Sequence, residues 1–294
     1  MSILNVLHRT RYRYANPVRF GDHRMMMRPR DSHDLRLIDT GLTISPAAKV
    51  RWMHDVFGNS VAVARFCEPG TELLVESSFR FQHYPLSAYA VTLEEFARAY
   101  PFSYDAEEIP DLGRTVERHY PDHEHKIDVW ARRFVEAETD HDTMAILVAM
   151  TEAIKAEFTY NPRDEMGTQD PLVTLESGTG TCRDYALFMM EAARSLGFAA
   201  RFVSGYLYDE SLTGGDAAAV VGGGATHAWV QIYLPGAGWV EFDPTNALVG
   251  GRNLIRVAVT RDPKQAIPLA GSFTGKTDDF LGMEVQVEIT AEAE

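Results

Sequence analysis

Alternation of polar and apolar residues dominates the first 86 residues of the chain. It covers residues 4–14, 35–44, 61–66 and 73–81, and the turn-forming sequence F-G-N-S precedes the third stretch. A period of two is typical of half-buried strands. Several short strands separated by turns predict a β-rich domain over residues 1–86, built as a small sandwich or barrel.

Helical periodicity replaces this alternation in the next part of the chain. Thr92 begins a capping-box pattern, which predicts a helix that ends before Pro101. Further helices are expected over residues 127–138 and 143–158, where apolar residues recur every three or four positions. Residues 87–160 are therefore predicted to be a helical lead-in to a second domain that continues to residue 294.

The remainder of the second domain mixes both periods. Residues 161–250 form its predicted core, which contains a helix beginning at Cys182 and ending before Gly197. Strands are predicted over residues 198–208, 226–234 and 239–243, and the sequence P-G-A-G joins the last two as a hairpin. The C-terminal residues 251–294 hold two more predicted strands, which we expect to complete the same sheet.

Composition and charge narrow the classes of partner. The 294 residues carry a net charge of −14, which argues against a nucleic-acid partner. Residues 1–85 contain 12 basic and 8 acidic residues, so the charge is uneven along the chain.

Neither a signal peptide nor a run of about 18 apolar residues is recognisable, so we expect no membrane association. Two cysteines do not make a disulfide framework, and a cytoplasmic location is expected.

Cys182 is the first candidate for chemistry. It follows a turn in the sequence G-T-G-T-C-R-D-Y-A and begins a predicted helix. The positive end of a helix and its unpaired N–H groups favour a thiolate, which is the nucleophilic form of cysteine. The alternative interpretation is a buried structural cysteine, and Cys67 is most simply a residue of that kind.

His227 and Asp243 are candidates for the base and the group that orients it. His227 lies in one strand of the predicted hairpin and Asp243 ends the other. If paired positions have an even sum, Asp243 lies opposite Trp229 and diagonal to His227, within reach of a carboxylate–imidazole contact. Cys182, His227 and Asp243 then have the chemistry of a nucleophilic triad. Each residue taken alone has an ordinary structural explanation.

Other polar clusters favour simpler interpretations. A metal site could use residues of the sequence R-H-Y-P-D-H-E-H, but Pro121 breaks the helix that would align His119 with His123, and no metal is expected. The remaining members of that cluster are Asp122, His125 and His141. An anion site could use His8, Arg24, Arg28 and Arg30, but charged sheet edges are commoner. The glycine-rich residues 214–224 are interpreted as a mobile flap beside the candidate site.

The chain closely resembles the bacterial transglutaminase-like family, whose members are often described as candidate cysteine proteases. The motifs that carry the resemblance are G-T-G-T-C-R-D-Y-A, A-A-R-F-V-S-G-Y-L, T-H-A-W-V and G-W-V-E-F-D-P-T-N, together with L-H-R-T-R-Y-R-Y, R-P-R and D-V-F-G-N near the N-terminus. The resemblance implies an α+β fold with a papain-like, transglutaminase-like catalytic core behind an N-terminal β-sandwich-like domain. It also implies a Cys-His-Asp triad on Cys182, His227 and Asp243.

The expected function is cysteine-dependent acyl transfer from amide bonds of a protein or peptide. Hydrolysis is expected as the outcome in preference to crosslinking, and no cofactor is expected. The backbone N–H of Cys182 is the expected oxyanion donor, with Tyr160 or Asn161 as a second donor and Trp229 as a wall of the site. Two rival hypotheses are a non-catalytic binding or scaffold protein and a metal-dependent hydrolase that uses the histidine cluster. Substrate identity and oligomeric state are not specified by the sequence.

Overall fold

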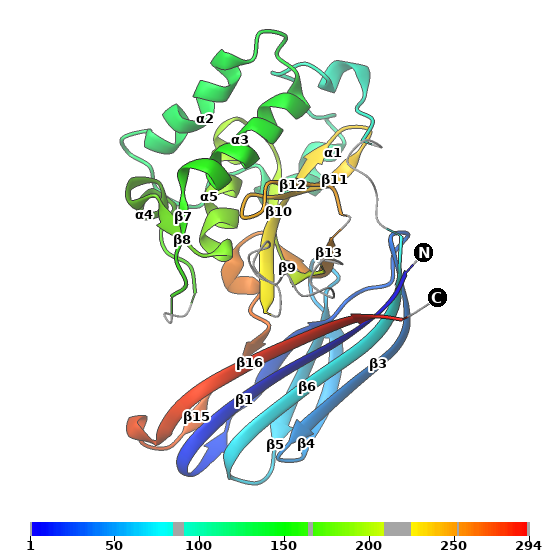
Figure 1. Cartoon of the computed structure of the whole chain (residues 1–294), viewed down its shortest axis with the longest axis vertical. Coiled ribbons are helices and arrows are strands. Elements are labelled where there is room, and N and C mark those ends of the chain that lie inside the picture. Colours follow the sequence, from blue (N-terminus) through cyan, green and yellow to red (C-terminus); the bar gives the residue numbers. More distant parts are fainter. Residues whose placement is uncertain (1, 85–90, 164–166, 209–224, 252, 293–294) are drawn as a thin grey trace.

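The computed structural model describes residues 2–84, 91–163, 167–208, 225–251 and 253–292. Figure 1 shows a helical layer at the top, an antiparallel sheet in the middle and a β region at the bottom. The α+β fold with an N-terminal β sandwich agrees with the sequence prediction. Within the described chain, every helix falls short of the length and apolarity that crossing a bilayer demands.

The N-terminal β domain consists of two facing sheets. Alternate side chains of both sheets point inward and form a shared core that includes Met25, Ala64 and Leu73. The predicted strands form, and two further strands appear that the alternation did not reveal. The strands are β1 (Ser2–Phe20), β2 (His23–Arg28), β3 (Leu35–Ser45), β4 (Ala48–His54), β5 (Ser60–Phe66) and β6 (Gly70–His83).

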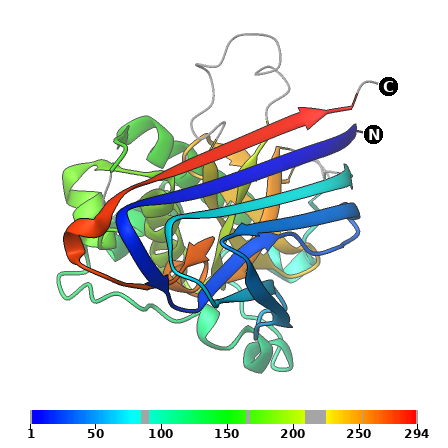
Figure 2. The same cartoon turned by 90° about the horizontal axis from the view of Figure 1, so that it is seen from below.

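The C-terminal strand corrects the predicted sheet membership. A strand does form at β16 (Phe280–Ala291), but it pairs antiparallel with β1 of the N-terminal domain and does not join the sheet of the second domain. Figure 2 shows the two chain ends side by side in this sheet. Two short strands, β14 (Leu269–Ala270) and β15 (Phe273–Thr274), also join the N-terminal domain. Strand β6 pairs with one edge of β1 and leaves the other edge open. Pairing of that open edge with β16 satisfies the N–H and C=O groups of β1.

The second domain contains a five-stranded sheet, here called the core sheet, in the order β12-β11-β10-β9-β13. Alternate residues of β10, such as Val230 and Ile232, face helix α5 (Cys182–Ser195) and share a core with it. The opposite face of the sheet is turned toward the N-terminal domain. The strands are β9 (Ala200–Leu207), β10 (Thr226–Leu234), β11 (Gly238–Asp243), β12 (Leu248–Val249) and β13 (Leu254–Thr260).

The helical lead-in is only partly as predicted. Instead of a helix after Thr92, the structure has a single turn, η2 (Glu95–Ala97). The N–H of Glu94 donates to the carbonyl of Pro235 at 2.9 Å, so the hairpin turn holds this segment extended and overrides the capping pattern. The other helices are α1 (Glu108–Leu112), α2 (Lys126–Ala137), α3 (Thr143–Glu157) and α4 (Pro171–Ser177).

A third apolar cluster joins the two domains. Leu4 and Phe81 of the N-terminal sheet pack with Tyr206 and Ile255 of the core sheet, and all four are buried. His8 lies in the same interface, where its Nδ1 is 2.8 Å from the hydroxyl of Tyr206. The domains are therefore held against each other by a continuous hydrophobic core.

Candidate active site

Cys182 is the first residue of α5, and its helix start is held by a buried carboxylate. Asp184 accepts hydrogen bonds at 2.8 Å from both the N–H and the hydroxyl of Thr181, which is the N-cap residue. Asp184 also accepts from Arg163 and from the N–H of Gln169. The turn before the nucleophile is thereby fixed, and the Cys182 side chain lies at the positive end of the helix.

His227 and Asp243 meet across the β10–β11 hairpin. The ladder pairs Val230 with Phe242, so its continuation sets Asp243 beside Trp229 and diagonal to His227. The Nε2 of His227 is 2.8 Å from Oδ2 of Asp243, and both side chains are fully buried. An ionised carboxylate only accepts hydrogen bonds, so Nε2 carries the proton and Nδ1 is the basic nitrogen.

The surroundings of this pair favour a protonated imidazole at His227 and an ionised carboxylate at Asp243. Burial disfavours a charged imidazole, but the Asp243 carboxylate, its hydrogen bond and the neighbouring Cys182 side chain together raise the pKa of His227 to about 10. Burial alone would raise the pKa of Asp243, yet His227, Asn246 and the Thr245 N–H lower it below its ordinary value. Among the described residues, Nδ1 has no hydrogen-bond partner. It is therefore the nitrogen available to the Cys182 thiol.

Trp229 forms the wall behind the imidazole. Its ring is stacked with that of His227, at a centroid distance of 5.9 Å and an interplanar angle of 27°. Its indole N–H donates to the buried Glu241 carboxylate. A Cβ at Gly205 would lie 2.6 Å from the indole ring and 2.1 Å from a carbonyl of Ile255, so only glycine permits this packing.

Tyr160 and Asn161, the two candidates for a second oxyanion donor, are placed differently. Tyr160 ends β7 (Thr159–Tyr160), which runs parallel to β8 (Thr179–Gly180) immediately before the nucleophile. Burial first, and then the neighbouring Cys182 thiol, raise the pKa of Tyr160 to about 12, so its hydroxyl stays a donor. Asn161 is exposed, and its N–H donates to the carbonyl of Gly180 at 2.9 Å.

Two family comparisons match separate parts of this chain. Residues 4–82 match the bacterial transglutaminase-like N-terminal region, and residues 129–244 match the transglutaminase-like superfamily. The second range contains Cys182, His227 and Asp243. The chain therefore combines a bacterial transglutaminase-like N-terminal region with a transglutaminase-like core. The family predicted from the motifs is thereby confirmed.

Similar proteins match almost the full length of this chain. An uncharacterized protein of Mycobacterium leprae is 27% identical over 98% of both chains. An uncharacterized protein of Mycobacterium tuberculosis is also 27% identical, over 96% of this chain and 91% of that one. The crystal structure of a candidate cysteine protease from Cytophaga hutchinsonii has a TM-score of 0.71 at 16% identity, over 100% of this chain and 92% of that one. At this identity the structural likeness supports the fold alone.

None of the other polar clusters that the sequence analysis singled out supplies a residue of the candidate triad. Asp122 accepts from the N–H groups of Lys126 and Ile127 at the start of α2. In the described chain, no group of three or more potential metal ligands converges at this cluster or elsewhere. The predicted flap at residues 214–224 lies outside the described residues.

The four residues of the suggested anion site are not brought together as one site. His8 is buried in the domain interface, and burial lowers its pKa to about 4. Arg24 donates to the carbonyl of Gln265, Arg28 lies over the ring of Trp52, and Arg30 donates to the carbonyl of Phe57. Each group therefore has a local partner of its own.

Sequence reasoning missed the groups that hold Asp243. The N–H of Thr245 donates to Oδ1 of Asp243, and the side-chain amide of Asn246 donates to Oδ2, both at 2.9 Å. The sequence D-P-T-N after a strand is a signal for such a turn, because Asp side chains commonly bond the backbone two residues later. Asp243 is the acceptor in each of the hydrogen bonds identified at its side chain, and this arrangement favours the ionised carboxylate.

The two cysteines of the chain provide an internal comparison of reactivity. At pH 6 we expect iodoacetamide to alkylate Cys182 at least about tenfold faster than Cys67, although Cys182 is 7% exposed and Cys67 is exposed. The reason is that the imidazole of His227 is available to take the thiol proton of Cys182, whereas Cys67 has no such base assigned to it. Peptide mass spectrometry over a time course measures both rates in one sample. Faster labelling of Cys67 would contradict the assignment of His227 as the base for Cys182, and His227→Gln should abolish the preference.

The His227–Asp243 pair should also make stability depend on pH. Folding raises the pKa of His227, so its contribution is complete below the ordinary value of 6.5 and is lost as pH rises toward 10. Folding lowers the pKa of Asp243, so that contribution is present above its ordinary value of 3.8 and is lost in acid. Urea unfolding at pH 6, 8 and 10 should show the stability advantage over His227→Gln shrinking by a few kcal/mol. A constant difference would refute this assignment.

Proposed function

We propose that this transglutaminase-like protein is a cysteine-dependent acyl-transfer enzyme that acts on amide bonds of proteins or peptides, with hydrolysis as its main outcome. The observation that carries the proposal is the buried imidazole of His227, which is bonded through Nε2 to Asp243 and neighbours the cysteine at the helix start, with no other partner for Nδ1 identified in the described part of the chain. This arrangement supplies a nucleophile, a base and an orienting carboxylate.

The first half of the reaction forms a thioester. The Cys182 thiolate attacks the amide carbonyl carbon, while His227 holds the proton that came from the thiol. The first-turn N–H of Cys182 is placed to donate to the developing oxyanion, and the Tyr160 hydroxyl is the candidate for a second donor. When the carbon–nitrogen bond breaks, the amine leaves with the proton from His227.

The second half restores the enzyme. His227, now neutral, accepts a proton from water as the oxygen attacks the thioester carbonyl. The carbon–sulfur bond breaks, a carboxylic acid is released, and the thiolate–imidazolium pair re-forms. A primary amine in place of water would form a new amide bond, which is the crosslinking outcome.

Three product measurements on one reaction mixture test the proposal. The full chain is incubated with a bacterial protein extract and a biotinylated primary amine, and new N-termini, released ammonia and incorporated biotin are quantified. We expect new N-termini or ammonia to exceed biotin incorporation, and all three to vanish in Cys182→Ala but not in Cys67→Ala. Dominant biotin incorporation would favour crosslinking. Equal products from the wild type and Cys182→Ala would favour the scaffold hypothesis.

A further inference from the structure

A cavity of about 620 Å³ lies between the N-terminal β domain and the core sheet, and it is here called the interdomain cavity. Its walls come from β9, β11 and β13 on one side, and from residues 30–34 and the turn before β5 on the other. Cys182, His227 and Asp243 are not among its lining residues. Cavities between domains are common ligand sites, so the interdomain cavity is a candidate ligand site.

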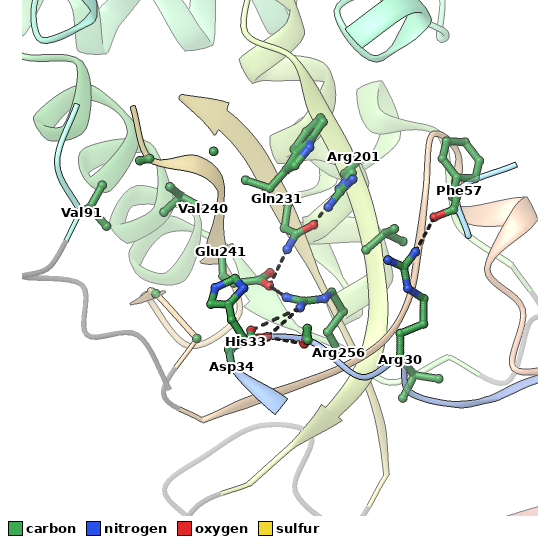
Figure 3. Close-up of a pocket in the computed structure, with 18 of the residues that line it drawn as sticks. Arg30, His33, Asp34, Phe57, Val91, Arg201, Gln231, Val240, Glu241 and Arg256 are labelled. Atoms are coloured by element: carbon green, nitrogen blue, oxygen red, sulfur yellow. Dashed lines mark hydrogen bonds and ion pairs between the residues drawn. The ribbon is translucent and has the colours of Figure 1, made fainter. Parts of the chain in front are cut away.

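A row of three polar side chains forms the floor of the interdomain cavity. Arg201, Gln231 and Glu241 are direct neighbours across β9, β10 and β11. The Nε of Arg201 donates to Gln231 at 2.7 Å, and the amide of Gln231 donates to Glu241 at 2.6 Å. Figure 3 shows this row continuing through Arg256 to Asp34.

Both acidic groups of the row are engaged by one arginine. Arg256 donates to Glu241 at 2.8 Å through Nη1 and to Asp34 at 3.2 Å through Nη2. Arg201 has no carboxylate within ion-pair distance among the described residues, although it is half-buried. Its guanidinium lies 4.0 Å from the centroid of the Trp239 ring. Burial lowers the pKa of Arg201 to about 9, because the attraction of Glu241 only partly opposes it and repulsion from Arg256 and Arg30 adds to it.

Arg30 supplies a second cation at the cavity. It is exposed, and Nη1 donates to the carbonyl of Phe57 at 3.1 Å, again with no carboxylate partner in the described chain. Three guanidinium groups therefore face the two carboxylates of Asp34 and Glu241, and the remaining ionisable group is the exposed His33. This balance leaves one uncompensated positive charge, which matches a singly charged anion better than a dianion.

We propose that the interdomain cavity binds a small molecule carrying a carboxylate, with that group between Arg201 and Arg30 and an apolar body against Trp239, Val91 and Val240. A guanidinium presents N–H groups in the planar arrangement that a carboxylate accepts. The apolar side chains lining the same cavity provide the surface that an uncharged ligand body requires. The proposal does not depend on the proposed enzymatic function.

Isothermal titration of the full chain with 4-phenylbutyrate, 4-phenylbutyramide and inorganic phosphate tests the proposal. We expect 4-phenylbutyrate to bind with a Kd of about 1 mM or lower, and the uncharged amide at least tenfold more weakly. Arg201→Met should weaken carboxylate binding by about tenfold or more, because a charged hydrogen-bond donor is lost. Arg30→Met, at an exposed position, should also weaken it. Absence of carboxylate binding overturns the proposal.

Two controls separate this site from the candidate active site. Alkylation of Cys182 before titration should leave the Kd of 4-phenylbutyrate unchanged, and a loss of binding would overturn the proposal by locating the ligand at the cysteine. Equal binding of the carboxylate and the amide, or no effect of either arginine variant, would overturn it as well. Tighter binding of phosphate than of 4-phenylbutyrate would reject the carboxylate as the ligand class.

Discussion

Replacing His227 with alanine is expected to lower the rate of Cys182 acylation by about a hundredfold to ten-thousandfold, the range associated with loss of a general base. The imidazole is the group that holds the thiol proton, and its Nδ1 is the nitrogen available to do so. Single-turnover acylation by 4-nitrophenyl acetate measures this step. The background should be Cys67→Ala, because the other thiol is exposed and would contribute signal.

A matched control for His227 is His123→Ala, which removes an exposed imidazole from the loop before α2. Its acylation rate should equal that of the parent. Retention of more than half of the parental rate in His227→Ala would mean that the thiol is activated without this base. Near-ultraviolet circular dichroism should accompany both variants, because His227 is fully buried beside Trp229.

Replacing Asp243 with alanine should produce the second largest effect, a loss of about a hundredfold to ten-thousandfold in acylation rate. The variant loses both the orientation of His227 and the negative charge that raises the pKa of the imidazole. Because burial then dominates, the pKa of His227 should fall below its ordinary value. The pH–rate profile should therefore show the imidazolium lost at a pH several units lower than in the parent.

Asp243→Asn separates orientation from charge at the same position. An amide oxygen can accept the hydrogen bond from His227, as it does in Cys-His-Asn sites, so the activity should lie between those of the parent and Asp243→Ala. The amide nitrogen would then face the N–H of Thr245, which donates to Asp243 in the parent. A buried donor without an acceptor should cost about 1–3 kcal/mol of stability, measured by urea unfolding. If Asp243→Asn is no more active than Asp243→Ala, the negative charge of Asp243 is its dominant contribution to activity.

The sequence predicted the second domain well where a local signal and the tertiary structure agreed. The strand predicted over residues 226–234 is β10, and the helix predicted from Cys182 is α5. In both, the hydrophobic period matches the face that is buried. The pattern after Thr92 failed because the Glu94 N–H is taken by the β10–β11 turn, which is a contact with a segment more than 130 residues away in the chain.

The parts of the candidate site that sequence reasoning missed are the supports of the triad. Asp184 lies two residues after Cys182 and joins Thr181, Arg163 and Gln169 around the start of α5. Glu241 lies two residues before Asp243 and is the buried acceptor for the indole N–H of Trp229. The Thr181–Asp184 contact has the spacing of a capping box, but the bonds from Arg163 and Gln169 to Asp184 and from Trp229 to Glu241 come from other segments of the chain.

The sequence by itself determined the β-rich first part, the mixed second part and the three residues of the candidate triad, which follow from local period, turn chemistry and residue type acting over a few positions. The transglutaminase-like fold was implied by the resemblance of the motifs, and the even-sum register of His227 and Asp243 was a condition that the structure had to supply. Only the tertiary structure decided that β16 covers β1, that Nδ1 and not Nε2 is available to Cys182, and that Arg201 lies in a cavity without a carboxylate partner among the described residues. Those properties depend on which groups meet across the chain, and alternation or spacing specifies which face is buried but not what covers it.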